Sequence, residues 1–411
     1  MRITLLTHYY APEVNAPASR WREIAREWRT LGHEVTVVTA VPSHPRGKVY
    51  PGYRNRLIQV EDVDHIRVIR LWTAIAPNEG FGRRLAGYLS YLVSVAINRW
   101  RLPPTDLVIS TSPQFFCGLA GRLLQKRKVP WILEIRDLWP ESIVSVGAMK
   151  QGTAIRMLEA IERWAYRRAD AVVAVTDGFV KHIASRAPST PLAVIKNGVD
   201  LSLFSPAPQE AAQFRGKWGL GDKFVAGYVG THGMAHGLES VIEAAEALRG
   251  RSEIVFLMVG EGSERARLES LAKERGLHNV LFLGQQPKEM MPAIWHAIDV
   301  GLVLLRRAET FKTVLPSKMF EIMAMNRPII MGVEGEAAAL LSEAQAGLNI
   351  EPQNGLALSQ ALVRLADDRP YANALGAAGR VFVSARFDRR QLARDYLAFV
   401  ERIVVERRAR C

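Results

Sequence analysis

Apolar residues recur along the chain with two periods, one typical of strands and one typical of helices. The chain opens with an apolar run at residues 3–7, a helical pattern at residues 20–31 and a second apolar run at residues 34–39. The apolar side chains of the helical segment share one face, namely Trp21, Ile24, Trp28 and Leu31. A strand–helix–strand opening of this kind predicts a parallel sheet with a helix packed on it.

Similar apolar runs follow through both halves of the chain. In the first half, strands are predicted at 67–71, 107–111, 131–135, 171–175 and 192–195. In the second half, strands are predicted at 224–229, 254–259, 280–283, 300–304, 328–331 and 348–350. Helices are predicted between them at 238–248, 264–274, 288–296, 316–325 and 336–343. This alternation is typical of doubly wound α/β domains.

The length of 411 residues is too great for one ordinary core, so two domains are expected. The turn signals Asn197-Gly198 and Ser205-Pro206 interrupt the pattern between the halves. We predict an α/β protein with Rossmann-like, doubly wound domains at 1–200 and 201–388 and a cleft between them. A helix within 389–411 follows the second sheet, and packing back on the first domain is one expected course for it.

Charge is distributed unevenly along the chain. The net charge is +13, and residues 1–200 hold 28 Lys and Arg against 17 Asp and Glu, whereas the rest holds 26 against 24. A basic first half indicates an anionic partner, which could be a membrane surface, a nucleic acid or a phosphorylated substrate. The sequence lacks the interleaved basic and aromatic residues typical of nucleic-acid binding, so no nucleic-acid partner is expected.

The two cysteines, Cys117 and Cys411, form no metal-ligand pattern, so no metal site and a reducing cytosolic environment are expected. The chain begins with a strand pattern instead of a signal peptide. No apolar run reaches the roughly 18 residues needed to cross a bilayer. A protein in the cytoplasm is therefore expected.

One uncharged segment, residues 85–98, differs from the rest of the basic half. It is flanked by Arg83 and Arg84 on one side and by Arg99, Trp100 and Arg101 on the other. Such a segment suits a helix that lies in a membrane interface, although an ordinary buried helix has the same pattern. The excess of positive charge in this half favours the membrane interpretation, because anionic lipid attracts each basic residue near its surface.

Two loops of the second half follow strands, where doubly wound sheets bind their ligands. After the strand that ends at Val229, glycines alternate with two histidines in the series Gly230, Thr231, His232, Gly233, His236 and Gly237. Glycines allow a ligand to approach the backbone closely, and imidazoles add hydrogen-bond donors. The alternative is a tight turn with surface histidines. The next loop, after Val259, carries Glu261, which either contacts a nucleoside or lies in solvent before a helix.

A third segment, residues 313–330, reads as a loop, a helix that begins at Pro316 and a short strand. Proline is common at the first position of a helix, whose N–H groups can hold a phosphate. Ser317 and Lys318 would lie in the first turn and Glu321 one turn deeper. Together they could bind a diphosphate and a ribose diol. As an isolated pair, Lys318 and Glu321 could equally be a solvated lysine and a capping carboxylate.

In the first half, Arg136 and Asp137 stand directly at the end of a predicted strand. Charged residues in that position must be paired or must bind a ligand. They are predicted either to form structural ion pairs or to contact the acceptor or the donor sugar. The loop at 13–20 follows the first strand, and its small residues would let a sugar approach.

Taken together, these segments resemble the family 4 retaining glycosyltransferases of the GT-B fold over essentially the whole chain. The resemblance rests on residues 197–206, the 230–237 loop, residues 259–262, residues 281–284 and residues 316–324. The 136–142 stretch and Pro316-Ser317-Lys318 are similar to bacterial surface-polysaccharide enzymes of the L-fucosamine transferase type.

The resemblance implies that the second domain binds a nucleotide sugar, which is UDP-linked in the favoured interpretation. It implies that Glu321 holds the ribose hydroxyls and that transfer retains the anomeric configuration with neither a metal nor a cofactor. The first glutamate of the family's Glu-x7-Glu pattern falls on Thr313, and Glu309 is a candidate substitute. The family's Arg and Lys of the 230–237 loop fall on Thr231 and His236. Lys318 and the two histidines would then stabilise the diphosphate.

The favoured function is a hexosyltransferase-type enzyme that moves a sugar to a lipid-linked saccharide for O-antigen or capsule synthesis, with a deoxy-amino sugar among the expected donors. Asp137, Arg136 and Lys318 are its candidate catalytic residues. The predicted partners are the nucleotide sugar, the lipid-linked acceptor and the inner membrane surface, on whose cytoplasmic face the enzyme would rest. The alternatives are a GT-B-type nucleotide-sugar epimerase or hydrolase, and a non-catalytic protein that binds the membrane surface.

Overall fold

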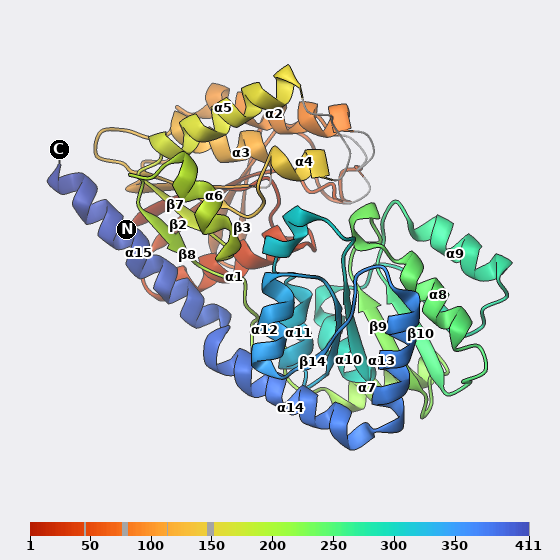
Figure 1. Ribbon diagram of the computed structural model, residues 1–411. Helices are drawn as coiled ribbons and strands as arrows, with labels where there is room; N and C mark the ends of the chain where they lie inside the picture. The colour runs from red at the N-terminus through yellow and green to blue at the C-terminus, as the bar shows by residue number, and fades with distance from the viewer. Residues whose placement is uncertain (45–46, 76–80, 113, 146–151, 411) are drawn as a thin grey trace. The chain divides into compact units, whose positions relative to one another are not determined.

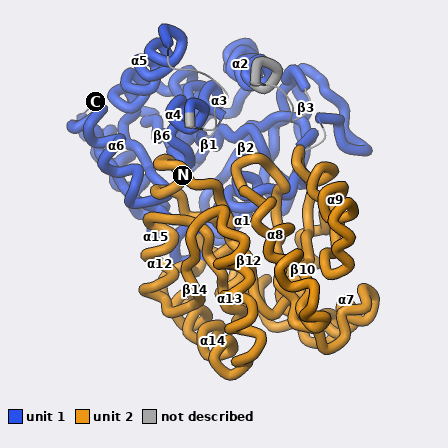
Figure 2. The backbone as a smooth tube through the Cα atoms, turned by 45° about the vertical axis from the view of Figure 1, so that its right-hand side comes forward, with its two compact units in different colours: residues 1–197, 389–411 blue, residues 198–388 orange. Residues whose placement is uncertain are grey.

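The computed structural model describes residues 1–44, 47–75, 81–112, 114–145 and 152–410. The chain forms two compact units, which Figure 2 shows in two colours. Unit 1 comprises residues 1–197 and 389–411, and unit 2 comprises residues 198–388. The chain therefore passes from one unit to the other after Asn197 and again after Asp388.

Unit 1 is built on an eight-stranded sheet with the order β3-β4-β2-β1-β5-β6-β7-β8. The strands are β1 (Arg2–Leu6), β2 (Glu34–Ala40), β3 (Ile58–Val63), β4 (Ile66–Leu71), β5 (Leu107–Thr111), β6 (Trp131–Ile135), β7 (Ala171–Ala174) and β8 (Leu192–Val194). All neighbours are parallel except β3, which pairs antiparallel with β4 at the edge. The sequence pattern did not predict β3, whose half-exposed residues lack a continuous apolar run.

The helices of unit 1 cover both faces of this sheet. They are α1 (Ala16–Thr30), α2 (Phe81–Asn98), α3 (Phe115–Ala120), α4 (Glu141–Ser145), α5 (Thr153–Arg168), α6 (Gly178–Arg186) and α15 (Arg389–Ala409). The predicted apolar face of the first helix is buried through Trp21 and Trp28, which pack against Tyr396 of α15. Trp28 Nε1 donates a hydrogen bond to the Ala393 carbonyl at 2.7 Å. The last helix of the chain (Figure 1) is therefore part of unit 1.

Unit 2 is built on a six-stranded parallel sheet with the order β11-β10-β9-β12-β13-β14. Its strands are β9 (Phe224–Val229), β10 (Ile254–Val259), β11 (Val280–Leu283), β12 (Val300–Leu304), β13 (Ile329–Gly332) and β14 (Gly347–Asn349). Strands β9, β10 and β12 are wholly buried, which explains why they read as continuous apolar runs in the sequence. The predicted doubly wound fold is confirmed for this half, as it is for the first.

The helices of unit 2 alternate with its strands. They are α7 (Pro208–Lys217), α8 (Glu239–Ala247), α9 (Arg265–Glu274), α10 (Met291–Ala297), α11 (Lys318–Ala324), α12 (Glu336–Ala344), α13 (Gly355–Asp367) and α14 (Arg369–Arg386). Three predicted starts were wrong by two or more residues. In unit 1, α1 begins at Ala16 and not at residue 20, so most of the predicted loop at 13–20 is helical. In unit 2, α10 begins at Met291 after a short 3-10 turn at Lys288–Met290, and α11 begins at Lys318 and not at Pro316. The preceding residues form a turn, in which the Pro316 carbonyl accepts from Met319 N and the Ser317 carbonyl from Phe320 N.

No helix in the described part of the chain is long and apolar enough to cross a membrane.

Candidate functional site

In unit 2, the strand order reverses between β9 and β12. The loops that follow β9, β10 and β12 all lie at the edge of the sheet formed by the carboxyl ends of its parallel strands. Doubly wound sheets bind ligands at the carboxyl ends of their strands beside such a reversal. The predicted residues Thr231, His232, His236 and Glu261 belong to the first two of these loops. Lys318 reaches the same edge from the start of α11.

Three side chains gather around the ring of Tyr228, and the four residues are called here the Tyr228 cluster: Tyr228, His232, His236 and Lys318. Lys318 Nζ lies 3.6 Å from the centroid of the Tyr228 ring. The centroids of the His232 and His236 rings lie 5.7 and 5.9 Å from the Tyr228 centroid. Tyr228 is held in place by its hydroxyl, which donates to the Thr231 carbonyl at 2.8 Å. The structure thus brings three of the predicted residues together.

Lys318 carries a buried ammonium group that lacks a hydrogen-bond partner among the described residues. Burial lowers its pKa to about 7, and the Glu321 carboxylate opposes that shift only partly. The cation–π contact with Tyr228 offsets part of the lost hydration. An ammonium group with three unused donors in a buried position is well suited to an incoming anion.

Both histidines of the cluster are neutral at pH 7. Burial, followed by the charge of Lys318, lowers the pKa of His232 to about 4 and that of His236 to about 3. The His232 side chain is fully buried beside Phe282, and neither ring nitrogen has a partner in the described structure. His236 Nδ1 lies 3.4 Å from the Leu304 carbonyl. Within the Tyr228 cluster, Lys318 is therefore the source of positive charge and the imidazoles are neutral hydrogen-bonding groups.

The glycines of this edge serve the packing of two loops against each other. A Cβ atom on Gly260 would lie 1.9 Å from the Gly230 carbonyl oxygen, and one on Gly262 would lie 2.2 Å from the His232 carbonyl oxygen. Gly230 N donates to the Val259 carbonyl and His232 N to the Glu261 carbonyl, each at 2.9 Å. These two backbone N–H groups are therefore already used within the protein, although the glycines of this loop were expected to let a ligand approach the backbone.

Glu321 is fixed by a tryptophan that the sequence did not single out. Trp295 Nε1, from the wholly buried side chain of Trp295 in α10, donates to Glu321 Oε2 at 3.1 Å. Glu321 also interacts electrostatically with Lys318. The predicted carboxylate and the predicted cation are thus neighbours at the start of α11.

Three further candidates of unit 2 have partners outside the Tyr228 cluster, namely Glu261, Glu309 and Thr313. Glu261 forms an ion pair with Arg265 at 2.5 Å, and the side chain of Glu309 is 86% exposed and pairs with Lys312. Thr313 Oγ1 donates to the Thr310 carbonyl. These contacts give no support to Glu309 as a substitute for the missing glutamate at position 313.

In unit 1, the structure separates Arg136 from Asp137. The Arg136 side chain is 6% exposed and lies 3.9 Å from Glu134 Oε1, in a network where Glu134 pairs with Arg20 at 3.0 Å. Nε and Nη1 of Arg136 have no hydrogen-bond partner in the described structure, and burial lowers its pKa to about 9. Arg136 is therefore both a member of a structural network, as one interpretation predicted, and a buried cation with unused donors.

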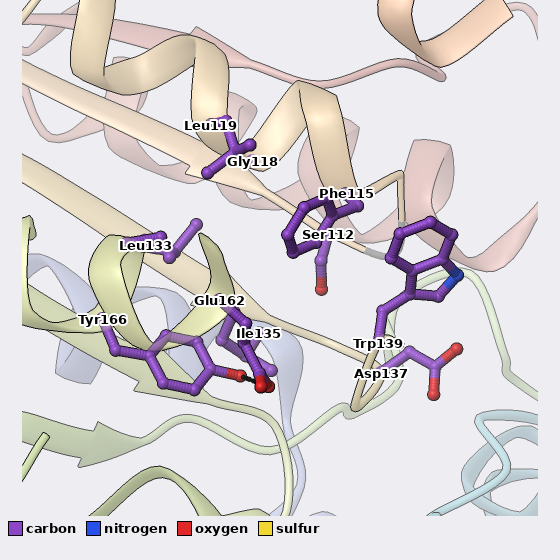
Figure 3. A pocket seen from close by; sticks show the side chains of 11 residues that line it. Ser112, Phe115, Gly118, Leu119, Leu133, Ile135, Asp137, Trp139, Glu162 and Tyr166 are labelled. Carbon is purple, nitrogen blue, oxygen red and sulfur yellow. Dashed lines mark hydrogen bonds between the residues drawn. The ribbon is translucent and has the colours of Figure 1, made fainter. Parts of the chain in front are cut away.

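Asp137 lines a separate small cavity (Figure 3) together with Ser112, Phe115, Trp139, Glu162 and Tyr166. Its volume of about 20 Å³ suffices for about one water molecule and not for a sugar. Asp137 Oδ2 accepts from Ser142 Oγ at 3.0 Å, and burial raises the pKa of Asp137 to about 6. Arg136 belongs to the Glu134 network whereas Asp137 lines the cavity, so the two side chains do not address one ligand together.

Tyr228 and Trp295 are the residues of this edge that sequence reasoning missed. Tyr228 sits within a continuous apolar strand and Trp295 within an apolar helix, so both read as core residues. The available signal was the polar atom that each side chain carries. Buried tyrosine and tryptophan usually find a hydrogen-bond partner, so a polar contact could have been expected for both. Among the described residues, no group of three or more His, Cys, Asp and Glu side chains is arranged to hold a metal ion.

Two family models match the chain. The model of the glycosyl transferase 4-like domain matches residues 15–198, and the model of glycosyl transferases group 1 matches residues 210–382. The matched ranges follow the two units and together cover most of the chain.

Individual relatives agree with these matches. The chain is 29% identical to WcaI of Escherichia coli K12, named as a colanic acid biosynthesis glycosyl transferase, over 81% of this chain and 84% of WcaI. It is 28% identical to the 2-deoxystreptamine glucosyltransferase of Streptomyces kanamyceticus, over 61% of this chain and 65% of that enzyme.

Solved structures agree on the fold. Sucrose-phosphate synthase from Thermosynechococcus elongatus superposes with a TM-score of 0.79 at 20% identity, covering 98% of this chain and 99% of that one. Anabaena HepE, solved in complex with UDP and glucose, gives 0.73 at 18% identity with the same coverage.

Proposed function

Since the chain belongs to the family 4 glycosyltransferases of the GT-B fold, we propose that it transfers a sugar from a UDP-linked donor to a lipid-linked saccharide with retention of anomeric configuration. The observation that carries the donor assignment is the buried, unpartnered ammonium of Lys318 beside Glu321. The relationship to WcaI supports a role in surface-polysaccharide synthesis, with O-antigen or capsule as the product class.

In this proposal, the donor diphosphate binds Lys318 Nζ, with the imidazoles of His232 and His236 as further hydrogen-bonding groups. Glu321 accepts hydrogen bonds from the ribose hydroxyls, in the orientation set by Trp295. The same edge of the sheet is bordered by Thr231, Gly233, Pro316 and Ser317. In the proposal, these residues shape the path by which the donor reaches the Tyr228 cluster. Since Glu261 pairs with Arg265, we give it no direct role in the proposal.

Transfer requires the acceptor hydroxyl oxygen to bond to the anomeric carbon while the bond from that carbon to the diphosphate oxygen breaks. The hydroxyl proton passes to the departing diphosphate, which leaves with the electron pair of the broken bond. Negative charge therefore grows on the diphosphate, where a positioned ammonium stabilises it more than it stabilises the ground state. Lys318 meets that requirement without a cofactor or metal ion.

Unit 1 is proposed to bind the acceptor and the membrane. The exposed face of α2 presents Leu89, Val93 and Ile97 at intervals of four residues, with exposed fractions of 46%, 48% and 59%. Trp100 follows at 81% and is flanked by Arg99 and Arg101. Apolar side chains next to tryptophan and arginine suit the headgroup region of an anionic bilayer.

Leu85 of α2 packs on the same buried apolar cluster as Ile155 and Leu158 of α5. Met157 and Trp164 of α5 are also exposed, at 60% and 44%. We call Leu89, Val93, Ile97 and Trp100 the apolar stripe. Its proposed partner is the cytoplasmic face of the inner membrane, where a lipid-linked acceptor would be presented. Arg136, with its unused donors, remains a proposed contact for the acceptor or the donor sugar.

Donor turnover tests the enzymatic part of this proposal. The protein is incubated with a panel of UDP-sugars, and release of UDP and the anomer of the sugar first formed are followed by NMR. The proposal predicts slow hydrolysis of at least one donor with retained configuration, abolished in Lys318→Met. Absence of UDP release from every donor, or release that Lys318→Met leaves intact, would contradict it.

A further inference from the structure

A second group of buried polar side chains lies in unit 1, where β1 and β2 end side by side. The two strand ends are joined at His8, whose carbonyl accepts from Ala40 N at 3.4 Å and from Thr39 Oγ1 at 3.1 Å. The segment after β1 contributes His8 and Glu13, and the segment after β2 contributes His44. We call these three residues the Glu13 cluster.

Glu13 has one satisfied and one unsatisfied carboxyl oxygen. Oε1 accepts from Ser43 N and His44 N, each at 2.9 Å, so that Glu13 fixes the segment that carries His44. Oε2 is buried and has no hydrogen-bond partner among the described residues, and Glu13 as a whole is 4% exposed. Burial raises the pKa of Glu13 to about 7 against the effect of its backbone hydrogen bonds. Folded proteins rarely leave such an atom unpaired, so an ordered water molecule or a ligand group is the expected partner.

The two histidines of the Glu13 cluster also have buried polar atoms without a hydrogen-bond partner. Nδ1 of His8 and Nδ1 of His44 are both buried and unpartnered in the described structure. Burial lowers the pKa of each to about 4, so both rings are neutral at pH 7 and each can donate or accept a hydrogen bond. Three unpaired polar atoms from two loops therefore belong to one cluster.

Aromatic rings surround these polar atoms. The centroid of the His8 ring lies 4.9 Å from that of Tyr9 and 5.3 Å from that of Tyr88. Tyr9 in turn lies 5.1 Å from His44. Tyr9, Tyr88 and His44 are only partly buried, whereas Glu13 is buried, so the rings are the part of this region that reaches the surface. Apolar ring faces beside neutral hydrogen-bonding groups are suited to a sugar ring, which has both kinds of surface.

The charges nearby argue against an anionic ligand. Arg70 is the buried cation that acts on Glu13, and its guanidinium is already used by Glu61 and by the carbonyls of Ala40 and Ala11. The Glu13 cluster therefore has no spare cation among its described neighbours and contains a carboxyl group instead. This differs from the Tyr228 cluster of unit 2, where the unpaired group is the ammonium of Lys318.

We propose that Glu13, His8 and His44 bind an uncharged, hydroxylated sugar ring, and that this ring belongs to the acceptor. Glu13 Oε2 accepts from one ring hydroxyl, the two imidazoles bond to others, and Tyr9 and Tyr88 pack on the apolar face of the ring. The identification of the ring as the acceptor rests on the proposed glycosyl transfer, whereas the presence of a sugar site does not.

Saturation-transfer NMR with soluble methyl glycosides tests the site directly. The panel contains methyl glycosides of hexoses, 6-deoxyhexoses and N-acetylhexosamines, measured at pH 8 with the full-length protein. Glu13→Gln keeps an oxygen for the Ser43 and His44 amides but puts an NH2 group in place of Oε2. His44→Phe keeps the ring shape and removes both nitrogens. Glu34→Gln, at the exposed start of β2, is the matched control.

At least one glycoside is expected to bind the parent and Glu34→Gln, and to bind about tenfold or more weakly to Glu13→Gln and His44→Phe. Inorganic phosphate should not compete. Absence of binding by every glycoside, equal binding by all four proteins, or displacement by phosphate would overturn the proposal. Stabilisation by UDP is measured on the same samples. If UDP stabilises them and no glycoside binds, the acceptor site alone fails; if glycosides bind and UDP does not, the donor assignment fails and the sugar site stands.

Discussion

Trp295 Nε1 donates a hydrogen bond to Glu321 Oε2 across 3.1 Å, from a side chain that is wholly buried in unit 2. A carboxylate held on one oxygen by a rigid indole keeps a fixed direction for its other interactions. In the proposed donor site, that direction serves the ribose hydroxyls. Trp295 is thus a positioning residue that acts through Glu321.

Removal of this hydrogen bond should weaken recognition of the ribose and spare the rest of the nucleotide. We expect Trp295→Phe to lower UDP affinity about fivefold, because one hydrogen bond to a charged group is lost. Affinity for 2′,3′-dideoxyuridine diphosphate, which lacks both hydroxyls, should not change. Isothermal titration calorimetry measures both ligands.

Trp131→Phe is the control for this experiment, because Trp131 is also buried and donates to Ser110 Oγ at 2.7 Å, but in unit 1. Its UDP affinity should equal that of the parent. An equal loss of affinity for UDP and for the dideoxy ligand in Trp295→Phe would show that Trp295 acts on general stability and not on the ribose contact.

The ammonium of Lys318 should make UDP binding depend on pH. In the free protein burial lowers its pKa to about 7, and a bound diphosphate would raise it again. Above pH 7 binding must therefore take up a proton, and UDP affinity should fall by up to about tenfold per pH unit between pH 7 and 9. His232 and His236, with pKa values near 4 and 3, stay neutral throughout this range, and burial raises the pKa of Tyr228 beyond it.

Two substitutions of Lys318 test whether the pH dependence of UDP binding comes from the charge of its ammonium group. Lys318→Met should lower UDP affinity about a hundredfold at pH 7. Lys318→Arg stays charged, so its affinity, although altered by the larger group, should be flat from pH 7 to 9. Calorimetry in buffers of different ionisation enthalpy counts the protons taken up. A parent protein that binds UDP equally well at pH 7 and 9 would refute the assignment.

The apolar stripe of unit 1 should bind anionic membranes. Val93→Glu combined with Ile97→Glu places two carboxylates on the exposed face of α2, and we expect about tenfold or greater loss of binding to phosphatidylglycerol vesicles. Val405→Glu on α15 is the control, since Val405 is 67% exposed and lies outside the stripe. Vesicle co-sedimentation measures binding, which added salt should weaken. Unchanged sedimentation of the double variant would contradict the proposed role of the apolar stripe in membrane binding.

The buried ion pair of Arg20 and Glu134 should contribute strongly to the stability of unit 1. Their side chains are 1% and 0% exposed, and Arg20 also donates to the carbonyls of Ile195 and Lys196. Glu134→Ala leaves a buried guanidinium without its counter-ion, which should cost about 3–5 kcal/mol of unfolding free energy. Urea unfolding followed by tryptophan fluorescence measures the change. An unfolding midpoint equal to that of the parent would contradict this role.

The periodicity of the sequence was sufficient to predict both doubly wound sheets, because wholly buried strands such as β9, β10 and β12 read as unbroken apolar runs. Strand β3 was missed, because an antiparallel edge strand keeps many polar residues and lacks that signal. The start of α11 was placed at Pro316 on the preference of proline for first turns, but the backbone there forms a turn first.

The candidate site was predictable in part. Strand ends and helix starts indicated Lys318, His232 and His236, but the sequence could not show that their side chains converge on Tyr228, since that depends on rotamers and tertiary packing. The separation of Arg136 and Asp137 could not be predicted, because both residues follow the end of β6, where the alternation of side chains along a strand no longer applies. The free oxygen of Glu13 could not be predicted from the sequence, because the amides that bind the other oxygen come from a distant segment.

Thermal unfolding with UDP, GDP and ADP, on the parent and on Glu321→Ala, tests the donor site most directly. A ligand at 100 times its dissociation constant should stabilise the folded protein by about 2.7 kcal/mol. The account predicts that UDP raises the melting temperature of the parent, that GDP and ADP do not, and that Glu321→Ala loses the response. A parent protein that responds to none of the three nucleotides, or a UDP response that survives in Glu321→Ala, would contradict it.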